Sequence, residues 1–489
     1  MADVPLGTAF DQLAQIAPDT VALIGPDGEV SRSELAAASS RAAREFAALG
    51  AKLGSLVTIG LPNGAPFYAA VLGAWKIGAI PQPVSAKLPP AELAALVELA
   101  DPAVVVGLES PGRPWLPATW TPDGSLPADP LPPAVPPSWK APTSGGSTGR
   151  PKLILAGLPG MRDAVVARGD TIRIGGDGEV FGVTAPLYHN GPFMFSLIAL
   201  LRGATVLVLD RFDGAHVLDA VVRHRVTWLY AVPTLMGRIL RLPSDVREAA
   251  DLSSLHTLFH LGAPCPESVK RAWIDWLGPE RVYELYAGTE SQSVCVISGT
   301  EWLEHPGSVG RPVSGEMRIG DADGRPLPVG EVGEVWMRPP EGTATYTYIG
   351  AEARERDGWE SLGDLGHMDA DGYLYLADRR ADLVLVGGSN VYPAEVEAAL
   401  ESHPRVLSSC VIGLPDDDLG ARVHAIVQLD DPAGEVSDGE LGAHVARLLA
   451  RQKVPSSFER VDHPLRDDTG KVRRSALRAA RLGEAAGTP

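Results

Sequence analysis

The chain contains 489 residues, of which 45% are hydrophobic and 21% charged, and its formal net charge is −18. One hydrophobic core rarely grows beyond about 250–300 residues, so two or three folding units are expected. The acidic balance argues against a surface for nucleic acid or anionic membranes, and any anionic substrate must be held by local positive groups.

The three cysteines, Cys265, Cys295 and Cys410, are odd in number and far apart. This pattern indicates neither a disulfide framework nor a zinc site, and it fits a reducing compartment. The N-terminal segment lacks the basic start and apolar core of a signal peptide. No apolar run reaches the length of a membrane span, so we expect a cytoplasmic protein.

Strands and helices alternate along the chain. The apolar run at 21–25 predicts a strand, and Ser31 or Ser33 is expected to cap the helix that follows. Further strands and helices are predicted, around a proline-rich irregular segment, at 56–61, 65–78, 204–210, 226–233, 255–264, 267–278 and 281–290. This alternation favours an α/β fold with a doubly wound parallel sheet.

The chain changes character near 378-DRRAD-382. The remainder contains two or three predicted strands and two or three helices, enough for a small α+β domain. We therefore expect a large N-terminal domain over residues 1–379 and a small C-terminal domain over 380–489. In open α/β sheets ligands bind beyond the carboxyl ends of strands, so the turns after the predicted strands are the expected site.

The stretch 143-TSGGSTGRPK-152 has the composition of a phosphate-binding loop. It is not a Walker loop, because Lys152 follows a proline and precedes Leu153, and the dinucleotide fingerprint is absent. Its amides and hydroxyls can surround a triphosphate, while Pro151 prevents a helix from starting there. The alternative is an ordinary surface loop. The residues assigned to ATP in this stretch are Thr143, Ser144, Gly145, Gly146, Ser147, Thr148, Gly149 and Lys152.

Five further segments occur downstream in order. They are 186-PLYHN-190, 261-LGAPCP-266, 286-YAGTE-290, 358-GWESLGDLGHMDADGYLYLADRR-380, and 387-GGSNVYPAEVEAAL-400 together with 469-TGKVRR-474. With the loop, they make nearly the whole chain resemble the adenylate-forming enzymes, which include acyl-CoA synthetases, adenylation domains and beetle luciferases. The resemblance implies a large N-terminal domain of doubly wound sheets, a β-barrel-like subdomain and a small mobile C-terminal domain.

The resemblance also implies roles in nucleotide binding. Tyr286 would stack on adenine, Thr289 would bind phosphate and Glu290 would hold Mg²⁺. Asp364 and Arg379 would grip the ribose and the adenylate. The remaining ATP-binding residues lie in the two turns near adenine and are Gly262, Ala263, Pro264, Ala287 and Gly288.

The resemblance places the later chemistry in the C-terminal domain. Lys471 would reach the attacking carboxylate and the α-phosphate during adenylation. Gly387, Gly388 and Lys453 would bind coenzyme A. Ala381 stands at the hinge position, where the family usually has Asp or Lys, so we expect altered domain alternation and a thioester step that is slow or delegated to a partner.

The pocket for the acyl group is expected to be apolar. Its candidate residues are Leu187, His189, Gly191, Phe193, Trp228, Gly262 and Gly288. His189 is either a catalytic residue of this pocket or an ordinary core histidine. The motif forms look most like bacterial synthetases for bile-acid, steroid and terpenoid carboxylates, so a bulky hydrophobic acid of secondary metabolism or sterol catabolism is expected, with an aryl or medium-chain fatty acid as the alternative.

These residues predict ATP- and Mg²⁺-dependent activation of a carboxylic acid to an acyl-adenylate, followed by transfer to coenzyme A. One alternative is a stand-alone adenylating enzyme that passes the acyl group to a carrier protein or another partner. Another is an inactive relative, which the presence of Glu290, Asp364, Arg379 and Lys471 opposes. A homodimer is an open expectation.

Overall fold

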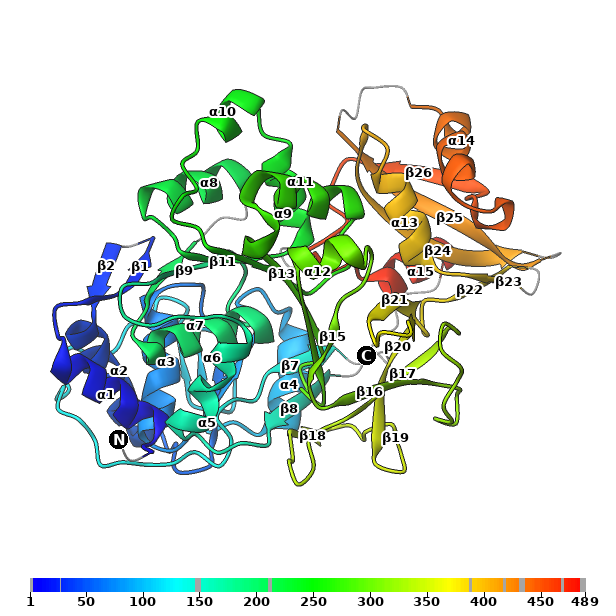
Figure 1. The fold of residues 1–489 in the computed structure, drawn as a ribbon. Coiled ribbons are helices and arrows are strands. Elements are labelled where there is room, and N and C mark those ends of the chain that lie inside the picture. Colours follow the sequence, from blue (N-terminus) through cyan, green and yellow to red (C-terminus); the bar gives the residue numbers. More distant parts are fainter. Residues whose placement is uncertain are drawn as a thin grey trace.

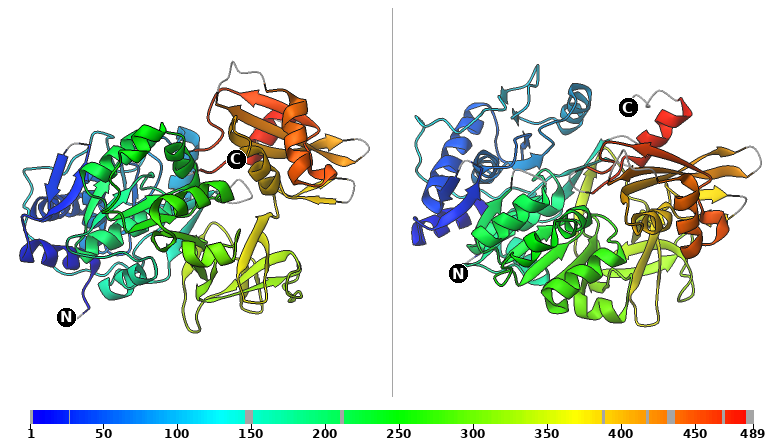
Figure 2. Two further views of the ribbon diagram at one scale, coloured as in Figure 1. Left: turned by 45° about the horizontal axis from the view of Figure 1, so that its top comes forward. Right: turned by 90° about the horizontal axis from the view of Figure 1, so that it is seen from above.

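The structure is a computed structural model that describes residues 3–26, 28–145, 151–209, 213–386, 389–416, 419–430, 436–467 and 470–483. Figure 1 shows a large body (blue to green), a β-rich part (yellow-green) and a small C-terminal unit (orange to red). Both views of Figure 2 keep the C-terminal unit on one side of the large body, next to the β-rich part.

A nine-stranded sheet crosses the large body. Its strand order is β15-β14-β13-β12-β11-β9-β10-β1-β2. The strands are β1 (Val21–Gly25), β2 (Gly28–Ser31), β9 (Val180–Val183), β10 (Thr205–Val208), β11 (Trp228–Ala231), β12 (Thr257–His260), β13 (Val282–Ala287), β14 (Val294–Ser298) and β15 (Arg311–Ser314). The run from β1 to β13 pairs in parallel, whereas β2, β14 and β15 are antiparallel. The predicted parallel core is therefore confirmed.

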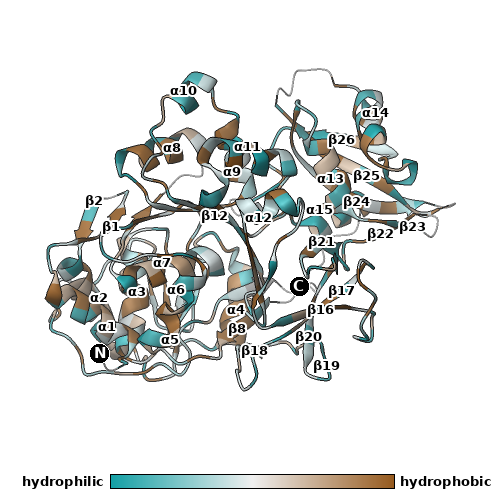
Figure 3. Cartoon of the chain, viewed as in Figure 1, coloured by the Kyte–Doolittle hydropathy of each residue, from teal (hydrophilic) through white to brown (hydrophobic). Residues whose placement is uncertain are grey.

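Helices cover both faces of this sheet (Figure 1), with α8, α9 and α11 on one face and α7 on the other. Those of the large body are α1 (Leu6–Ile16), α2 (Arg32–Ala48), α3 (Ala65–Lys76), α4 (Pro90–Ala100), α5 (Arg162–Val166), α6 (Arg168–Thr171), α7 (Asn190–Arg202), α8 (Gly214–Arg223), α9 (Pro233–Leu240), α10 (Ser244–Glu248), α11 (Glu267–Leu277), α12 (Gly299–Glu304) and the 3₁₀ turn η1 (Pro279–Arg281). Figure 3 shows both hydrophobic and hydrophilic bands on α8 and α11, as expected for helices with one face on a sheet.

A second, parallel sheet lies in the N-terminal third. Its order is β4-β3-β5-β6, formed by β3 (Leu56–Ile59), β4 (Ile80–Pro83), β5 (Val104–Val106) and β6 (Trp115–Leu116). Helix α2 starts where the sequence predicts, because the Ser31 side chain accepts from the Glu34 amide and the Glu34 carboxylate accepts from the Ser31 amide.

The β-rich part contains two small sheets. One has the order β16-β17-β20-β19 with β21 also paired to β20, and the other has the order β18-β8-β7. The strands are β7 (Thr143–Gly145), β8 (Pro151–Ala156), β16 (Glu316–Gly320), β17 (Gly333–Arg338), β18 (Tyr346–Ile349), β19 (Glu355–Arg356), β20 (Trp359–Met368) and β21 (Leu374–Arg379). Within the described residues neither sheet closes on itself, so the expected barrel-like subdomain is a pair of open sheets.

The C-terminal unit has hydrophobic clusters of its own, centred on residues such as Val396, Val411 and Val427. Its elements are β22 (Val384–Val386), β23 (Ser389–Val391), α13 (Pro393–Glu401), β24 (Val406–Asp416), β25 (Gly420–Leu429), α14 (Asp438–Leu448), η2 (Arg451–Lys453), β26 (Ser457–Val461) and α15 (Arg474–Leu482). Strands and helices mix as predicted for an α+β unit.

The sequence predicts neither disulfides nor a membrane span, and both features can be examined in the described residues. The three cysteines are free thiols. Among the helices in the described ranges, none combines the length and the apolar composition needed to cross a bilayer.

Candidate active site

The base of the glycine-rich loop is a two-stranded ribbon. Strand β8 begins at Pro151 and pairs with β7, with Thr143 opposite Leu153. No helix starts at the proline, as the sequence predicts. Gly146, Ser147, Thr148 and Gly149 lie outside the described residues, as does the side chain of Ser144.

Lys152 on β8 is held by two oxygen atoms. Its Nζ donates to Glu290 Oε1 at 3.1 Å and to the Tyr348 hydroxyl at 2.8 Å, and it lies 4.0 Å from the centre of the Tyr348 ring. The Tyr348 hydroxyl also donates to Glu290 Oε1. Sequence reasoning missed Tyr348, which β18 brings beside the loop through its pairing with β8.

The donor set near this loop suits a phosphate-bound magnesium ion. Glu290 supplies one nearly buried carboxylate, and Thr143 has a buried hydroxyl oxygen with no hydrogen-bond partner among the described residues. In the same described ranges, no three metal-binding side chains cluster together. Mg²⁺ commonly takes one or two carboxylates and completes its shell with water and phosphate oxygens. These residues therefore fit the group.

Asp364 lies at the centre of the predicted ribose site. Its Oδ2 accepts from the Tyr286 hydroxyl at 2.7 Å, and its Oδ1 accepts from Arg379 Nε at 3.1 Å. Burial, followed by the charge of Asp364, raises the pKa of Tyr286 well above its ordinary value, so this hydroxyl remains a donor. Strands β20 and β21 pair Asp364 directly with Arg379, which explains why residues 15 positions apart act together.

Two glycines in the nucleotide turns have structural reasons to be glycine. Gly262 has a φ of 91°, in the left-handed region, at the turn it forms with Ala263 and Pro264. A Cβ atom on Gly288 would lie 2.2 Å from Leu362 Cδ1 and 3.0 Å from Glu290 Oε2. A side chain at position 288 would therefore displace Leu362 and crowd the Glu290 carboxylate.

The turn that carries Lys471 docks on the large body. A Cβ atom on Gly470 would lie 2.9 Å from Thr234 Oγ1 and 3.6 Å from Ala263 Cβ, so the turn sits against the Gly262–Ala263 region. The Lys471 amide donates to Asp467 Oδ1 at 3.0 Å, which holds the turn closed.

Charges meet around this turn. Loss of surrounding water, followed by the charge of Arg379, lowers the pKa of Lys471, whereas Asp467 and Glu290 raise it. Burial, followed by the charge of Lys471, lowers the pKa of His189 to about 4. His189 is therefore neutral at pH 7, and its buried Nε2 has no hydrogen-bond partner among the described residues. The charge of Lys471 therefore acts on His189, and the charges of Arg379 and Glu290 act on Lys471.

The acyl candidates divide into two groups. A Cβ atom on Gly191 would lie 2.8 Å from the Tyr230 hydroxyl and 3.4 Å from Leu261 Cδ1, so these three residues lie close together at the start of α7. Sequence reasoning missed Tyr230 and Leu261. Both lie at or just beyond the carboxyl ends of parallel strands, the edge at which the sequence places the site.

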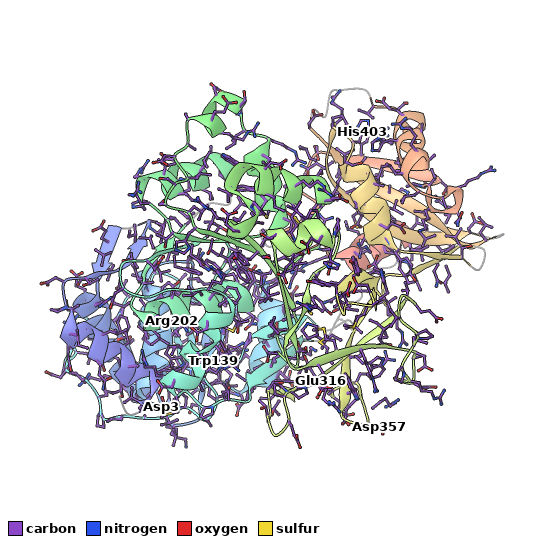
Figure 4. The ribbon with its side chains drawn as sticks, in the orientation of Figure 1. Asp3, Trp139, Arg202, Glu316, Asp357 and His403 are labelled. Atoms are coloured by element: carbon purple, nitrogen blue, oxygen red, sulfur yellow. The ribbon has the colours of Figure 1, made fainter. Side chains whose placement is uncertain are left out.

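Leu187, Phe193 and Trp228 belong instead to the packed core, with at most 1% exposure. Trp228 stacks between Phe181 and Phe259, and Phe193 packs against Trp139. Figure 4 shows Trp139 inside the large body. These side chains are packed in the core, and their contact with an acyl group stays a prediction.

Of the candidates for coenzyme A binding, the structure describes only Lys453. Lys453 Nζ donates to both oxygens of Glu395, at 2.7 and 2.6 Å. Gly387 and Gly388 lie outside the described residues.

Ala381 lies between two anchored residues. Arg380 donates to Glu334 of the β-rich part, with Nη1 and Oε2 3.3 Å apart. Asp382 accepts from Arg474 of the C-terminal unit at 2.5 Å. Sequence reasoning missed Asp382 and Arg474, because ionic partners 92 positions apart have no local pattern.

Two family models match most of the chain. The AMP-binding enzyme family model matches residues 10–347, and the AMP-binding enzyme C-terminal domain model matches residues 395–471. The chain therefore belongs to the AMP-binding enzyme family. This confirms, at the level of the family, the class of AMP-forming acid–thiol ligases and the expected ATP, Mg²⁺ and coenzyme A.

Individual relatives extend over almost the whole chain. A sulfoacetate–CoA ligase from Cupriavidus necator is 30% identical over 96% of this chain and 97% of its own length. A feruloyl-CoA synthase from an Amycolatopsis species is 32% identical over 97% and 98%. Among solved structures, the o-succinylbenzoate CoA synthetase from Bacillus subtilis in complex with its acyl-adenylate intermediate matches with a TM-score of 0.82, at 28% identity, over 98% of both chains. None of these matches identifies a bile-acid, steroid or terpenoid substrate.

Proposed function

We propose that this enzyme activates a carboxylic acid with ATP and transfers the acyl group to coenzyme A. The observation that carries the proposal is the docking of Gly470 against Ala263, which brings the neighbouring Lys471 within range of the charges of Arg379 and Glu290. In this proposal the Lys471 ammonium group lies where the carboxylate and the α-phosphate approach each other.

In the first step, a carboxylate oxygen attacks the α-phosphorus of ATP, and pyrophosphate leaves with the electron pair of the broken P–O bond. Both reactants are anions, so catalysis depends on positioning and on charge neutralisation. Lys471 supplies positive charge between them. Its pKa is lowered in the site alone, and the arriving anions favour its protonated form again.

The phosphates lie, in this proposal, along the glycine-rich loop. Lys152 and the unpartnered hydroxyl of Thr143 donate to the β- and γ-phosphate oxygens. Magnesium, when bound at Glu290, supplies a Lewis acid that neutralises the leaving pyrophosphate. The proposed contact between Lys152 and phosphate replaces the one that Lys152 makes with Glu290.

Asp364 and Arg379 orient the nucleotide. The Asp364 carboxylate accepts hydrogen bonds from the ribose hydroxyls, while Tyr286 and Arg379 keep it in place. Because those two donors come from different strands, the carboxylate is oriented before nucleotide binds. We propose that the Tyr286 ring lies along adenine and that Thr289 donates to phosphate.

The second step transfers the acyl group to a thiol, whose sulfur attacks the acyl carbon as AMP leaves. We propose that the C-terminal unit turns about Ala381 to bring the 387–388 loop and Lys453 to coenzyme A. Lys453 must then give up Glu395 for a phosphate of the coenzyme. The domain limits 1–379 and 380–489 belong to this proposal.

For the acid we propose a hydrophobic skeleton, as the apolar and aromatic surroundings of Gly191 suggest. The terpenoid or steroid acid indicated by the motif forms is the first class to test, and aryl and medium-chain fatty acids are the second. Relatives with similar identity act on acids as different as sulfoacetate, 2-succinylbenzoate and ferulate, so the family alone does not select among them.

The alternative acceptor is a carrier protein. A fatty acid–[acyl-carrier-protein] ligase from Streptomyces coeruleorubidus is 28% identical over 97% of this chain. This similarity is the reason to test a carrier protein as the acceptor. Acid-dependent exchange of pyrophosphate into ATP tests adenylation across a panel of acids. Adding coenzyme A should then give AMP and a thioester. Exchange without thioester would reject coenzyme A and favour the carrier protein, and no exchange with any acid would overturn the proposed function.

A further inference from the structure

Lys140 is a buried lysine that the proposed reaction does not use. It is only 4% exposed, and its Nζ donates to the side-chain oxygen of Asn190. Within the described residues no carboxylate lies within ion-pair distance of this ammonium group. Its remaining contact is with the face of the Trp139 ring, whose centre is 5.1 Å away.

The other buried lysines of the large body are paired. Lys76 donates to Asp11 at 2.6 Å, and Lys270 donates to Glu284 at 2.6 Å. Removing an ammonium group from water is costly unless an opposite charge compensates for it. Lys140 therefore differs from the other two buried lysines, each of which has a carboxylate partner.

One cation and one carboxylate influence the charge of Lys140 without forming an ion pair with it. Burial, followed by the charge of Arg168, lowers the pKa of Lys140 to about 7, and Glu290 only partly opposes this. Glu290 is itself engaged by Lys152 and Tyr348. Among the described residues, Arg168 also has no carboxylate within ion-pair distance and donates to the Ala164 carbonyl oxygen. Among the described residues, neither Lys140 nor Arg168 therefore has a carboxylate partner of its own.

The position of Lys140 connects it to the acyl side of the site. Its partner Asn190 is the first residue of α7, next to His189 and Gly191. His189 is within range of the charge of Lys471, and Gly191 faces Tyr230 and Leu261. Lys140 therefore lies behind the first turn of α7, whose neighbouring residues meet the reacting carboxylate and the acyl skeleton in the proposed reaction.

We propose that Lys140, oriented by Asn190, binds a second anionic oxygen group of the acid substrate, distinct from the carboxylate that is activated. This inference rests on the proposed function. An ammonium group has three donors, and Asn190 accepts from one of them, so two remain for a carboxylate or a group of similar charge and shape. The substrate class is thus a diacid with an apolar or aromatic skeleton, and Lys140 determines specificity within it.

The experiment compares each of a series of phenylalkane dicarboxylic acids with its monomethyl ester. In the wild-type enzyme, kcat/KM for pyrophosphate exchange should favour the best diacid over its monoester by at least about tenfold, the scale of one charge-assisted hydrogen bond. Lys140→Met should reduce this ratio to about one, and Lys140→Arg should keep part of it. Lys87→Met, a change at an exposed lysine, should leave the ratio as it is.

Other outcomes would overturn the inference. A diacid preference of the wild type that survives in Lys140→Met would show that another group binds the second anion. A rise in the KM for ATP that is equal for diacids and monoesters would show that Lys140 serves the nucleotide. Exchange with monoacids but not with diacids would reject the inference and leave the proposed function intact.

A binding measurement distinguishes failure of the proposed anion site from failure of the proposed reaction. The diacids alone should raise the thermal midpoint of the wild type more than their monoesters do, and Lys140→Gln should remove the difference. Such a shift without any exchange would support the anion site while rejecting the proposed reaction. Equal shifts for diacid and monoester would reject the site itself.

Discussion

The nucleotide side and the acyl side of the site differ in how their charged groups are satisfied. On the nucleotide side, Lys152 is paired with Glu290, and Asp364 accepts from Tyr286 and Arg379. On the acyl side, and among the described residues, Lys140 has only a neutral partner and His189 has a buried nitrogen without one. Charged side chains that pair with other protein groups are oriented before any ligand binds. Charged side chains without such partners require a group of the substrate to compensate for their burial.

The largest effect should come from the group that joins the two sides. Lys471→Ala is expected to reduce pyrophosphate exchange by at least about 10²-fold, the scale of one positioned charge stabiliser. Lys87→Ala, at an exposed site, is the matched control. A loss of less than tenfold in steady-state exchange would mean that another cation performs this role.

The paired side can be broken at its central carboxylate. Asp364→Asn keeps the size of the side chain but loses the charge that Tyr286 and Arg379 recognise. We expect the KM for ATP to rise by about tenfold or more, because charge-assisted hydrogen bonds are roughly twice as strong as neutral ones. Tyr286→Phe removes one donor and should have a smaller effect in the same titration. The reverse order of effects would contradict the central role of Asp364.

The low pKa of Lys140 on the acyl side predicts an unusual dependence of the free energy of unfolding on pH. Burial holds the pKa of Lys140 near 7, below its ordinary value of 10.5. The unfolded chain therefore binds this proton more tightly, and the resulting cost to folding is fully present below pH 7 and disappears as the pH rises toward 10.5. Comparison of Lys140→Met with Lys87→Met isolates this contribution. The free energy of unfolding of Lys140→Met should gain on the control at pH 7 and lose that advantage by pH 10, and parallel curves would contradict the low pKa.

The smallest effect should come from the hinge position. Ala381→Lys restores a charge that the family usually has, and it should alter coenzyme A-dependent turnover of preformed adenylate by several-fold while changing pyrophosphate exchange much less. Stopped-flow measurement of both steps checks this. If the wild type already performs the two steps at equal rates, the expectation of a slow thioester step is wrong.

Much of the fold and of the nucleotide side could be predicted from the sequence, because both depend on local order. The capping box at Ser31 and the alternation of strands and helices are written in short segments. Glu290, Asp364 and Lys471 stand in recognisable motifs, and the structure gathers Glu290 and Lys471 with Arg379 and His189, with Asp364 bonded to Arg379.

The acyl side could not be predicted in the same way. Lys140 lies in an unremarkable segment, and only burial away from carboxylates distinguishes it. Phe193 and Trp228 look like pocket residues by their type, yet helix and strand geometry turn them into the core. The open sheets of the β-rich part were also hidden, because strand pairing between distant segments leaves no short-range pattern.

The two anchors on either side of Ala381 have a consequence for motion. Arg380 is tied to Glu334 on one rigid part, and Asp382 is tied to Arg474 on the other. A linker held so close on both sides cannot distribute a rotation along its length. If the C-terminal unit turns as proposed while both ion pairs hold, the rotation must be concentrated in the backbone torsions of about one residue.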